Sequence, residues 1–287
     1  MIEVRNLTYT YPKSQVDAVS NISFSVKNGE IFGFLGPSGA GKSTTQKLLI
    51  KLIRGYSGNV EVLSRPLPKW NGDFYAQIGV GFELPNHYLK LTGEENLKLF
   101  ASFYPKVAHK PIDLLKMVEL EEHANKPVES YSKGMKMRLN FVRALLHDPQ
   151  LLFLDEPTSG LDPGYSRMIK DIIIDLKNKG KTIFLTTHNM HDADELCDRV
   201  AFMADGELKL IGTPRDLKLQ HGSRKVRVEV RDNGAIGKEE FDFCGLAENS
   251  AFLKAIASPN LQAIHSCEES LEDVFMRTTG KKLGGEF

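Results

Sequence analysis

The strongest chemical signal in this sequence is the run GPSGAGKST at residues 36–44, which fits the pattern G-x-x-x-x-G-K-[ST]. Glycines at these spacings allow successive backbone N–H groups to curl around phosphate oxygens, and the start of a following helix adds a favourable dipole. In this pattern the lysine reaches the β- and γ-phosphates, and the serine hydroxyl ligates Mg²⁺. The run therefore predicts a nucleotide-phosphate site made of Gly36, Pro37, Ser38, Gly39, Ala40, Gly41, Lys42, Ser43 and Thr44. The alternative is a glycine-rich turn that holds no ligand.

Two carboxylates end a second apolar run, LLFLDEP at residues 151–157. Asp155 is suited to holding a Mg²⁺ shell, and Glu156 is suited to polarising an attacking water. Taken alone, such a pair at the end of a strand is more often part of a solvated loop. Its position after a phosphate-binding loop, on a parallel-sheet pattern, favours nucleotide hydrolysis.

A histidine, His188, follows another strand-like run in TTHNMHDADE. Together with His191, Asp192, Asp194 and Glu195 it forms a group whose residue types can ligate a metal. Four of these residues are expected to begin a helix, where acidic side chains favourably face the positive end of the helix dipole. The helix start is the favoured interpretation, and a metal site is the alternative.

The elements that position these residues read as strands alternating with helices. IEVRNLTY and ISFSV are strand-like, and LLFLDEP and TIFLTTH read as buried strands. EIFGFLGPSGAGKSTTQKLLIKLI reads as a strand, a turn and a helix whose apolar face carries Leu48, Leu49, Leu52 and Ile53. This alternation predicts an α/β fold with a parallel sheet covered on both faces.

Residues 84–147 interrupt the alternation because they read as mostly helical. The capping box Thr92-x-x-Glu95 opens a helix predicted over 92–104, and a second helix is predicted over 133–147. We expect these residues to form a helical subdomain.

The character of the chain changes after about residue 215. KVRVEV and FDF read as strands, and Ser270 reads as the cap of a final helix. Residues 216–287 are therefore predicted to form a small C-terminal α+β appendage to a nucleotide-binding domain over residues 1–215.

Composition excludes several classes of protein. The 287 residues are 41% hydrophobic and 26% charged, which suits a sizeable core. Lys plus Arg and Asp plus Glu both total 37, so net charge gives no reason to expect nucleic-acid binding. The three cysteines have no metal-ligand spacing and fit a reducing compartment. The sequence reads without a signal peptide or an apolar run of the roughly 20 residues that span a bilayer, so action at a membrane is expected to need a partner.

Several motifs in order resemble one family, the ATP-binding-cassette (ABC) proteins. GPSGAGKST, YSKGM (131–135), LLFLDEP, SGLD (159–162) and TTHN follow the order and approximate spacing of that family over roughly residues 1–215. The tail SLEDVFMRTTG is similar to that of cassette subunits serving multidrug- and polysaccharide-type (ABC-2 type) exporters. The resemblance implies a P-loop NTPase core, in which a parallel sheet is joined by an antiparallel β subdomain and the helical subdomain.

The resemblance also implies a set of roles. Two cassettes close head to tail around two ATP molecules, and each ATP meets Lys42 and Ser43 of one chain and Ser132 and Gly134 of the other. Glu156 acts as general base, His188 touches the γ-phosphate, and Asp162 links the two sites. Tyr11 stacks on adenine, with Tyr9 as the alternative. The implied ligands are ATP and Mg²⁺, the ion being held by Ser43, Asp155 and Glu83.

Two positions depart from the family pattern. Glu83 stands where the family usually has glutamine; a carboxylate can ligate Mg²⁺ or accept a hydrogen bond, but it cannot donate one. A solvated loop acid is the alternative at this position. In YSKGM, Lys133 and Met135 replace a glycine and a glutamine, while Ser132 and Gly134 keep a helix start available to a phosphate. We interpret YSKGM as a working variant of the family signature.

The sequence therefore predicts a Mg-dependent ATPase subunit of a transporter, peripheral on the cytoplasmic face of the cell membrane and engaged in export. Its expected partners are a second cassette chain, favoured as a homodimer, and an integral-membrane permease that docks near Glu83 and LPNHYLKLTGEENL. One alternative is a soluble cassette ATPase acting on ribosomes or nucleic acid; one P-loop, no heptad arm and zero net charge argue against it. Another is a P-loop kinase, which the remaining family motifs argue against.

Overall fold

A computed structural model describes residues 1–222, 224–232 and 235–281. The chain divides into two compact units, the first comprising Met1–Ile211 and the second beginning at Gly212. Within the described residues, no helix combines the length and the apolar character needed to cross a membrane.

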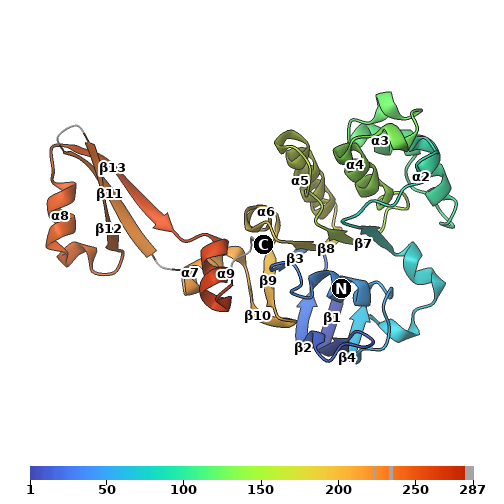
Figure 1. Cartoon of the computed structure of the whole chain (residues 1–287), viewed down its shortest axis with the longest axis horizontal. Coiled ribbons are helices and arrows are strands. Elements are labelled where there is room, and N and C mark those ends of the chain that lie inside the picture. Colours follow the sequence, from blue (N-terminus) through green and yellow to red (C-terminus); the bar gives the residue numbers. More distant parts are fainter. Residues whose placement is uncertain (223, 233–234, 282–287) are drawn as a thin grey trace. The chain divides into compact units, whose positions relative to one another are not determined.

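The first unit is built on a sheet with the strand order β10-β9-β3-β8-β7-β6 (Figure 1). The pairs β3–β8, β3–β9, β7–β8 and β6–β7 are all parallel, which confirms the predicted parallel sheet. Every residue of β3, β7 and β8 is buried, as expected for strands covered on both faces. The strands are β3 (Ile31–Leu35), β6 (Ile78–Gly81), β7 (Leu151–Asp155), β8 (Thr182–Thr187), β9 (Arg199–Ala204) and β10 (Glu207–Gly212).

A second sheet, with the order β2-β1-β4-β5, is antiparallel in each of its pairs. It comprises β1 (Ile2–Thr10), β2 (Asp17–Val26), β4 (Ser57–Val62) and β5 (Arg65–Pro66). Phe24 of β2 stacks on Phe32 and packs edge-on against Phe34, both in β3, so the two sheets share one aromatic core. This core fixes the strand that leads into the phosphate-binding loop.

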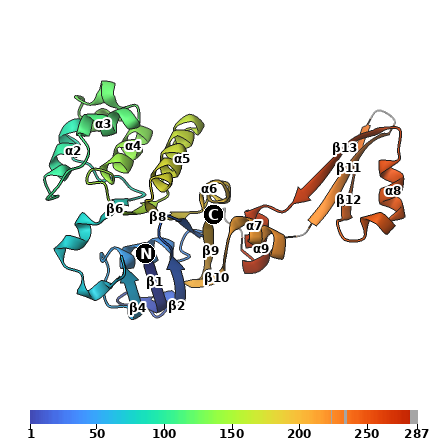
Figure 2. The same ribbon diagram turned by 180° about the vertical axis from the view of Figure 1, so that it is seen from behind.

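Two helices contact the strands of the sheets, a third packs against one of those two, and three others form a group of their own. The first set is α1 (Lys42–Leu49), α5 (Pro163–Asn178) and α6 (Met190–Leu196). Figures 1 and 2 show the second set together on the opposite side of the parallel sheet from β1, β2 and β4; it comprises α2 (Gly93–Ala101), α3 (Pro111–Met117) and α4 (Lys133–Arg143). Short 3₁₀ turns occupy Leu67–Lys69, Gly72–Ala76, Glu121–His123, Val128–Ser130 and Leu246–Glu248.

The helix predictions hold in position but not at every boundary. The predicted capping box is present, with Thr92 and Glu95 exchanging hydrogen bonds at the start of α2. Helices α2 and α4 end before residues 104 and 147, the predicted ends. Leu52 and Ile53 were wrongly assigned to this helix, because α1 ends at Leu49. Leu52 is 55% exposed, whereas Ile53 packs against the core from outside the helix.

The second unit contains the antiparallel order β12-β11-β13 with α8 packed on one face. Val226 and Val228 of β11 form a small core with Phe241, against which Phe252 of α8 packs. Ser270 caps the last helix through a capping box with Asp273, as predicted. The elements are α7 (Pro214–His221), β11 (Arg224–Asp232), β12 (Ala235–Asp242), α8 (Ser250–Ile256), β13 (Leu261–Glu268) and α9 (Leu271–Thr279).

Candidate functional site

The GPSGAGKST loop joins the buried strand β3 to helix α1. Gly41 precedes the helix with a φ of +107°, and an added Cβ would lie 2.5 Å from the Ala18 carbonyl oxygen. Only glycine fits there, because both the backbone angle and the space exclude a side chain. Among the described residues no side chain caps α1, so the first N–H groups of this helix are available to an anion.

Lys42 holds the loop together from inside. Its Nζ donates to the Gly36 carbonyl at 2.6 Å and to the Pro37 carbonyl at 3.0 Å, curling the loop over the ammonium. Burial lowers the pKa of Lys42, and the carboxylates of Glu156, Asp155 and Glu83 oppose that shift. The lysine and the predicted acidic residues therefore share one electrostatic site.

Ser43 and Asp155 meet beside this lysine. The Ser43 hydroxyl lies 3.3 Å from Asp155 Oδ1, which also accepts from the Thr186 hydroxyl of β8. A hydroxyl and a carboxylate are the hard oxygen donors that Mg²⁺ prefers, so these residues fit that ion chemically. Glu83 lies in the same site but is exposed, on the loop that follows β6.

Glu156 is fixed at the end of β7 by the next strand along the sheet. Its Oε1 accepts from the backbone N–H of His188 at 2.9 Å and lies 2.7 Å from His188 Nδ1, while its Oε2 accepts from the Thr187 hydroxyl at 3.1 Å. A carboxylate can only accept, so Nδ1 carries the proton in this pair and Nε2 is left for another partner. The φ of Glu156 is +50°, a conformation that is uncommon for a residue with a side chain and that recurs at functional sites.

A cavity of about 420 Å³ brings most of the predicted residues together. Tyr11 lies at its edge, 39% exposed, with its hydroxyl 3.1 Å from Thr44 Oγ1. Tyr9, the alternative to Tyr11, is only 6% exposed and belongs to the core. The lining residues are Tyr11, Ala18, Ser38, Gly39, Ala40, Gly41, Lys42, Ser43, Thr44, Glu83, Glu156 and His188.

Six predicted residues lie outside the set that lines this cavity. Gly36, Pro37 and Asp155 adjoin it through their contacts with Lys42 and Ser43, whereas the other three lie on different elements. Ser132 caps α4 by accepting from the Met135 N–H at 3.2 Å, and Asp162 caps α5 by accepting from the Tyr165 N–H at 3.1 Å. An added Cβ on Gly134 would lie 3.6 Å from Leu161 Cδ2, so the YSKGM segment and the SGLD segment touch. Ser132, Gly134 and Asp162 thus form a second group of predicted site residues on this chain, apart from the cavity.

Thr186 and Thr187 were missed as site residues by sequence reasoning. Their hydroxyls hold the Asp155 and Glu156 carboxylates, and the TTH run that contains them was the available signal. Polar side chains at the carboxyl end of a strand beside two carboxylates are expected to face them in a parallel sheet.

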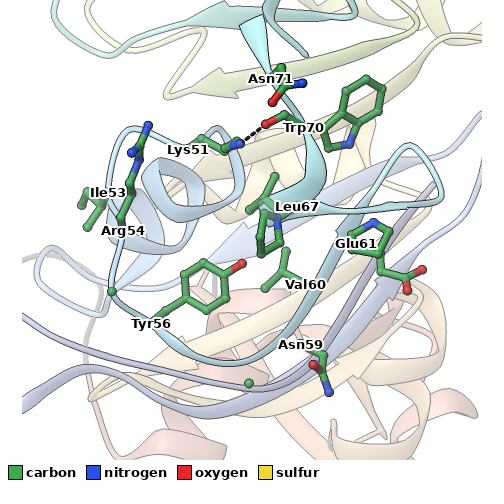
Figure 3. Close-up of a pocket in the computed structure, with 14 residues that line it drawn as sticks. Lys51, Ile53, Arg54, Tyr56, Asn59, Val60, Glu61, Leu67, Trp70 and Asn71 are labelled. Carbon is green, nitrogen blue, oxygen red and sulfur yellow. Dashed lines mark hydrogen bonds between the residues drawn. The ribbon is translucent and has the colours of Figure 1, made fainter. Parts of the chain in front are cut away.

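A larger cavity, of about 730 Å³, lies in the antiparallel part of the first unit (Figure 3). Val60 and Leu67 contribute apolar surface, Tyr56 lies beside them, and Lys51 donates to the Trp70 carbonyl across the opening. It is lined by none of the predicted site residues, so size alone does not identify the nucleotide site.

The metal alternative near His188 has a simpler explanation. His191, Asp192 and Glu195 place ligand atoms within 4.8 Å of one another on α6, the helix that was predicted there. Lys170 Nζ donates to Asp192 Oδ1 at 3.3 Å and also to Glu195. An ammonium already neutralises these carboxylates.

The fold and the site define a P-loop nucleotide hydrolase: a glycine loop between a parallel strand and a helix, with a carboxylate pair on the neighbouring strand. Comparison with known proteins narrows the class. The family profile described as "ABC transporter" matches residues 19–159, and that of the "Fluoroquinolone efflux ABC transporter C-terminal domain" matches residues 224–268.

The chain is similar to curated proteins along nearly its whole length. It is 54% identical to the fluoroquinolones export ATP-binding protein MT2762 of Mycobacterium tuberculosis, covering 99% of this chain and 94% of that protein. It is 34% identical to the Nod factor export ATP-binding protein I of Burkholderia orbicola, covering 98% of each. Among solved structures, the dimeric cassette MJ0796 bound to ADP and Pi matches with a TM-score of 0.69 at 28% identity, covering 74% of this chain and 98% of that one.

The chain belongs to the ATP-binding proteins of ABC transporters. It is an ATPase that powers a transporter, and the α/β P-loop fold predicted for it is confirmed. The relatives favour this function over a soluble cassette that acts on ribosomes or nucleic acid.

Proposed function

We propose that two copies of this chain close head to tail around two ATP molecules and drive export through a separate membrane protein. The observation that carries the proposal is the division of the site residues into two groups. Lys42, Ser43 and Glu156 belong to the cavity, whereas Ser132 and Asp162 cap helices outside its lining. A second copy can present its capped helix starts to the ATP that the first copy holds. The dimeric structure of the similar cassette MJ0796, bound to ADP and Pi, supports the pairing of two copies.

Different residues of the site bind different parts of ATP. Backbone N–H groups of the loop and the Lys42 ammonium bind the phosphates, and Tyr11 stacks on the adenine. Ser132 and Gly134 of the second copy offer the γ-phosphate the start of α4. Glu83, exposed at the edge of the cavity, accepts a hydrogen bond from water or supports the ion.

Glu156 is the proposed general base for hydrolysis. It takes a proton from the attacking water as the water oxygen bonds to the γ-phosphorus and ADP leaves, and His188 Nε2 faces the γ-phosphate. The bonds from Thr187 and His188 fix the carboxylate before ATP arrives. Ser43, Asp155 and Glu83 hold Mg²⁺, which when bound neutralises phosphate charge.

The membrane partner is proposed to dock on the segment after Glu83. Four large apolar side chains are exposed there and on α2's C-terminal side: Leu84, Tyr88, Leu89 and Phe103, at 73, 54, 49 and 65%. Such a surface suits an apolar helix of a partner. The chain then lies peripherally on the cytoplasmic face of the membrane, where ATP is available.

The exported cargo is proposed to be a fluoroquinolone-like antibiotic. The support is the 54% identity to a fluoroquinolones export ATP-binding protein and the match of residues 224–268 to a C-terminal domain named for fluoroquinolone efflux. We propose residues 1–215 as the ATPase domain and residues 216–287 as an appendage specific to this exporter type.

The test is a pull-down of the tagged Glu156→Gln chain from detergent-solubilised native membranes with Mg-ATP, because slowed hydrolysis holds the closed dimer. We expect recovery of a multi-span membrane protein with two copies of this chain. The control is the double variant Glu156→Gln with Ser132→Arg, whose added side chain blocks the second group and should abolish ATP-dependent pairing. Recovery of ribosomes or soluble partners alone, or unchanged pairing in the control, contradicts the proposal.

A further inference from the structure

A largely buried cluster of polar and charged side chains joins helices α5 and α6 to the loop that runs from Glu156 to the start of α5. Asp192 of α6 accepts from the Thr158 hydroxyl at 2.7 Å through Oδ2 and from Lys170 at 3.3 Å through Oδ1. Asp192 is 7% exposed and Lys170 is 8% exposed, so water competes little for these bonds. Lys170 also donates to Glu195, which accepts from Arg167 at 2.5 Å.

Each of the three elements that meet in this cluster carries or adjoins a residue of the proposed mechanism. Thr158 lies in the loop that runs from Glu156 to Asp162. Asp192 lies on α6, one turn after His188, and Lys170 lies on α5, the helix that Asp162 caps. The cluster therefore connects the cavity residues Glu156 and His188 with the second group, to which Asp162 belongs.

The loop itself has a point that can bend. Gly160 has a φ of +70°, in the left-handed region that glycine adopts freely. Between this glycine and β7, the Thr158 hydroxyl is the side-chain tie that the structure shows from the loop to α6. If it is released, Asp162 loses its side-chain link to α6 and keeps its place at the start of α5 and its neighbours' contacts with the YSKGM segment.

We propose that Thr158 and Asp192 are positioning residues, with Lys170 as the counter-ion of Asp192. Together they fix the position of the loop that carries Asp162 relative to His188. The inference rests on the proposed head-to-tail dimer, in which Asp162 meets the second copy. A hydroxyl held by a buried, charge-paired carboxylate is a rigid connection, because moving it would leave a buried acceptor unsatisfied. The connection acts on closure and turnover rather than on the binding of nucleotide to one copy.

Two substitutions of Thr158 in the full-length chain separate this role from a structural one. Thr158→Val keeps the shape and removes the hydroxyl, whereas Thr158→Ser keeps the hydroxyl. We expect Thr158→Val to lower kcat about 10-fold, with KM for ATP and the Kd for ADP within about 2-fold of the unsubstituted chain. Thr158→Ser should restore kcat to within about 3-fold.

A second readout is ATP-driven dimerisation in the Glu156→Gln background, measured by light scattering. Thr158→Val should raise the ATP concentration needed for pairing about 10-fold, and Lys170→Met should do the same by removing the counter-ion. Unchanged kcat and pairing in Thr158→Val overturn the inference, as does a loss of ADP binding or of folding, since the role would then be structural. If the Glu156→Gln chain without further substitutions fails to pair with ATP, the proposed dimer itself is contradicted instead.

Discussion

Asn140 and Arg143 of α4 hold the loop that carries Glu83. The hydrogen bonds of Asn140 allow the loss of stability on its removal to be predicted. Asn140 Nδ2 donates to the Phe82 carbonyl at 2.6 Å, and its Oδ1 accepts from Arg143 at 2.7 Å. Arg143 also donates to the Asn86 carbonyl at 2.8 Å. Asn140 is 2% exposed and Arg143 is 9% exposed, so the lost bonds of Asn140 are not replaced by bulk water.

The loss of stability expected for Asn140→Ala is the sum of two hydrogen bonds of different strength. The bond to the Phe82 carbonyl joins neutral groups and contributes about 1 kcal/mol, whereas the bond from the buried Arg143 guanidinium contributes about 2 kcal/mol. We therefore expect the free energy of unfolding to fall by about 3 kcal/mol. The matched control is Lys98→Ala, which breaks an exposed ion pair with Glu94 and should cost at most about 0.5 kcal/mol.

The assay is urea unfolding, monitored by tryptophan fluorescence and by circular dichroism at 222 nm. Trp70 is the single tryptophan of the sequence and lies in the first unit, so its emission reports on the unit that contains α4. The reasoning is refuted if Asn140→Ala costs less than about 1 kcal/mol at an unchanged m-value, or no more than the Lys98→Ala control.

Three further predictions concern pH and nucleotide binding. Burial lowers the pKa of His87 from 6.5 to about 4, so the unfolded state binds more protons between these values, and stability is lost as the pH falls from 6.5 towards 4. His87→Gln, which can still donate to the Lys136 carbonyl, should flatten that loss in urea titrations; equal pH slopes would count against it. Gly41→Ala should abolish binding of a fluorescent ATP analogue while leaving circular dichroism unchanged, because the added Cβ meets the Ala18 carbonyl; retained affinity would show that the loop adapts. Tyr11→Ala should weaken ATP binding about 10-fold and Tyr11→Phe about 2-fold, because stacking needs the ring and not the hydroxyl; equal losses would assign the effect to the bond with Thr44.

The cavity could be predicted because its residues are encoded in short local runs. GPSGAGKST carries its strand, turn and helix with it, so Lys42 and Ser43 follow directly from the pattern. Asp155 ends β7 and Glu156 follows it directly, and parallel strands bring their carboxyl ends to one edge. Local sequence and sheet topology therefore place these residues together without knowledge of any long-range contact.

Other features depend on contacts between distant segments and leave no local pattern. Asn140 reads as a polar interruption of an apolar helix, and only the Phe82 carbonyl, brought beside it by the fold, explains its burial. Thr158 and Asp192 are 34 positions apart, and neither belongs to a spacing rule. Leu52 fitted a helical period, but α1 ends before it, because periodicity does not fix where a helix stops.

The YSKGM departure is compatible with a working signature because the neighbouring loop makes room for it. Ser132 keeps its cap bond to Met135, so the start of α4 is intact. Lys133 lies against Gly160 of the SGLD segment, where an added Cβ would come within 2.9 Å of Lys133 Cε. The lysine therefore occupies space that a side chain at position 160 would need, and its stem need not cross the face that Ser132 and Gly134 offer. Because Gly160 also lies between Thr158 and Asp162, a residue with a side chain at this position would disturb both the lysine and the proposed positioning of Asp162.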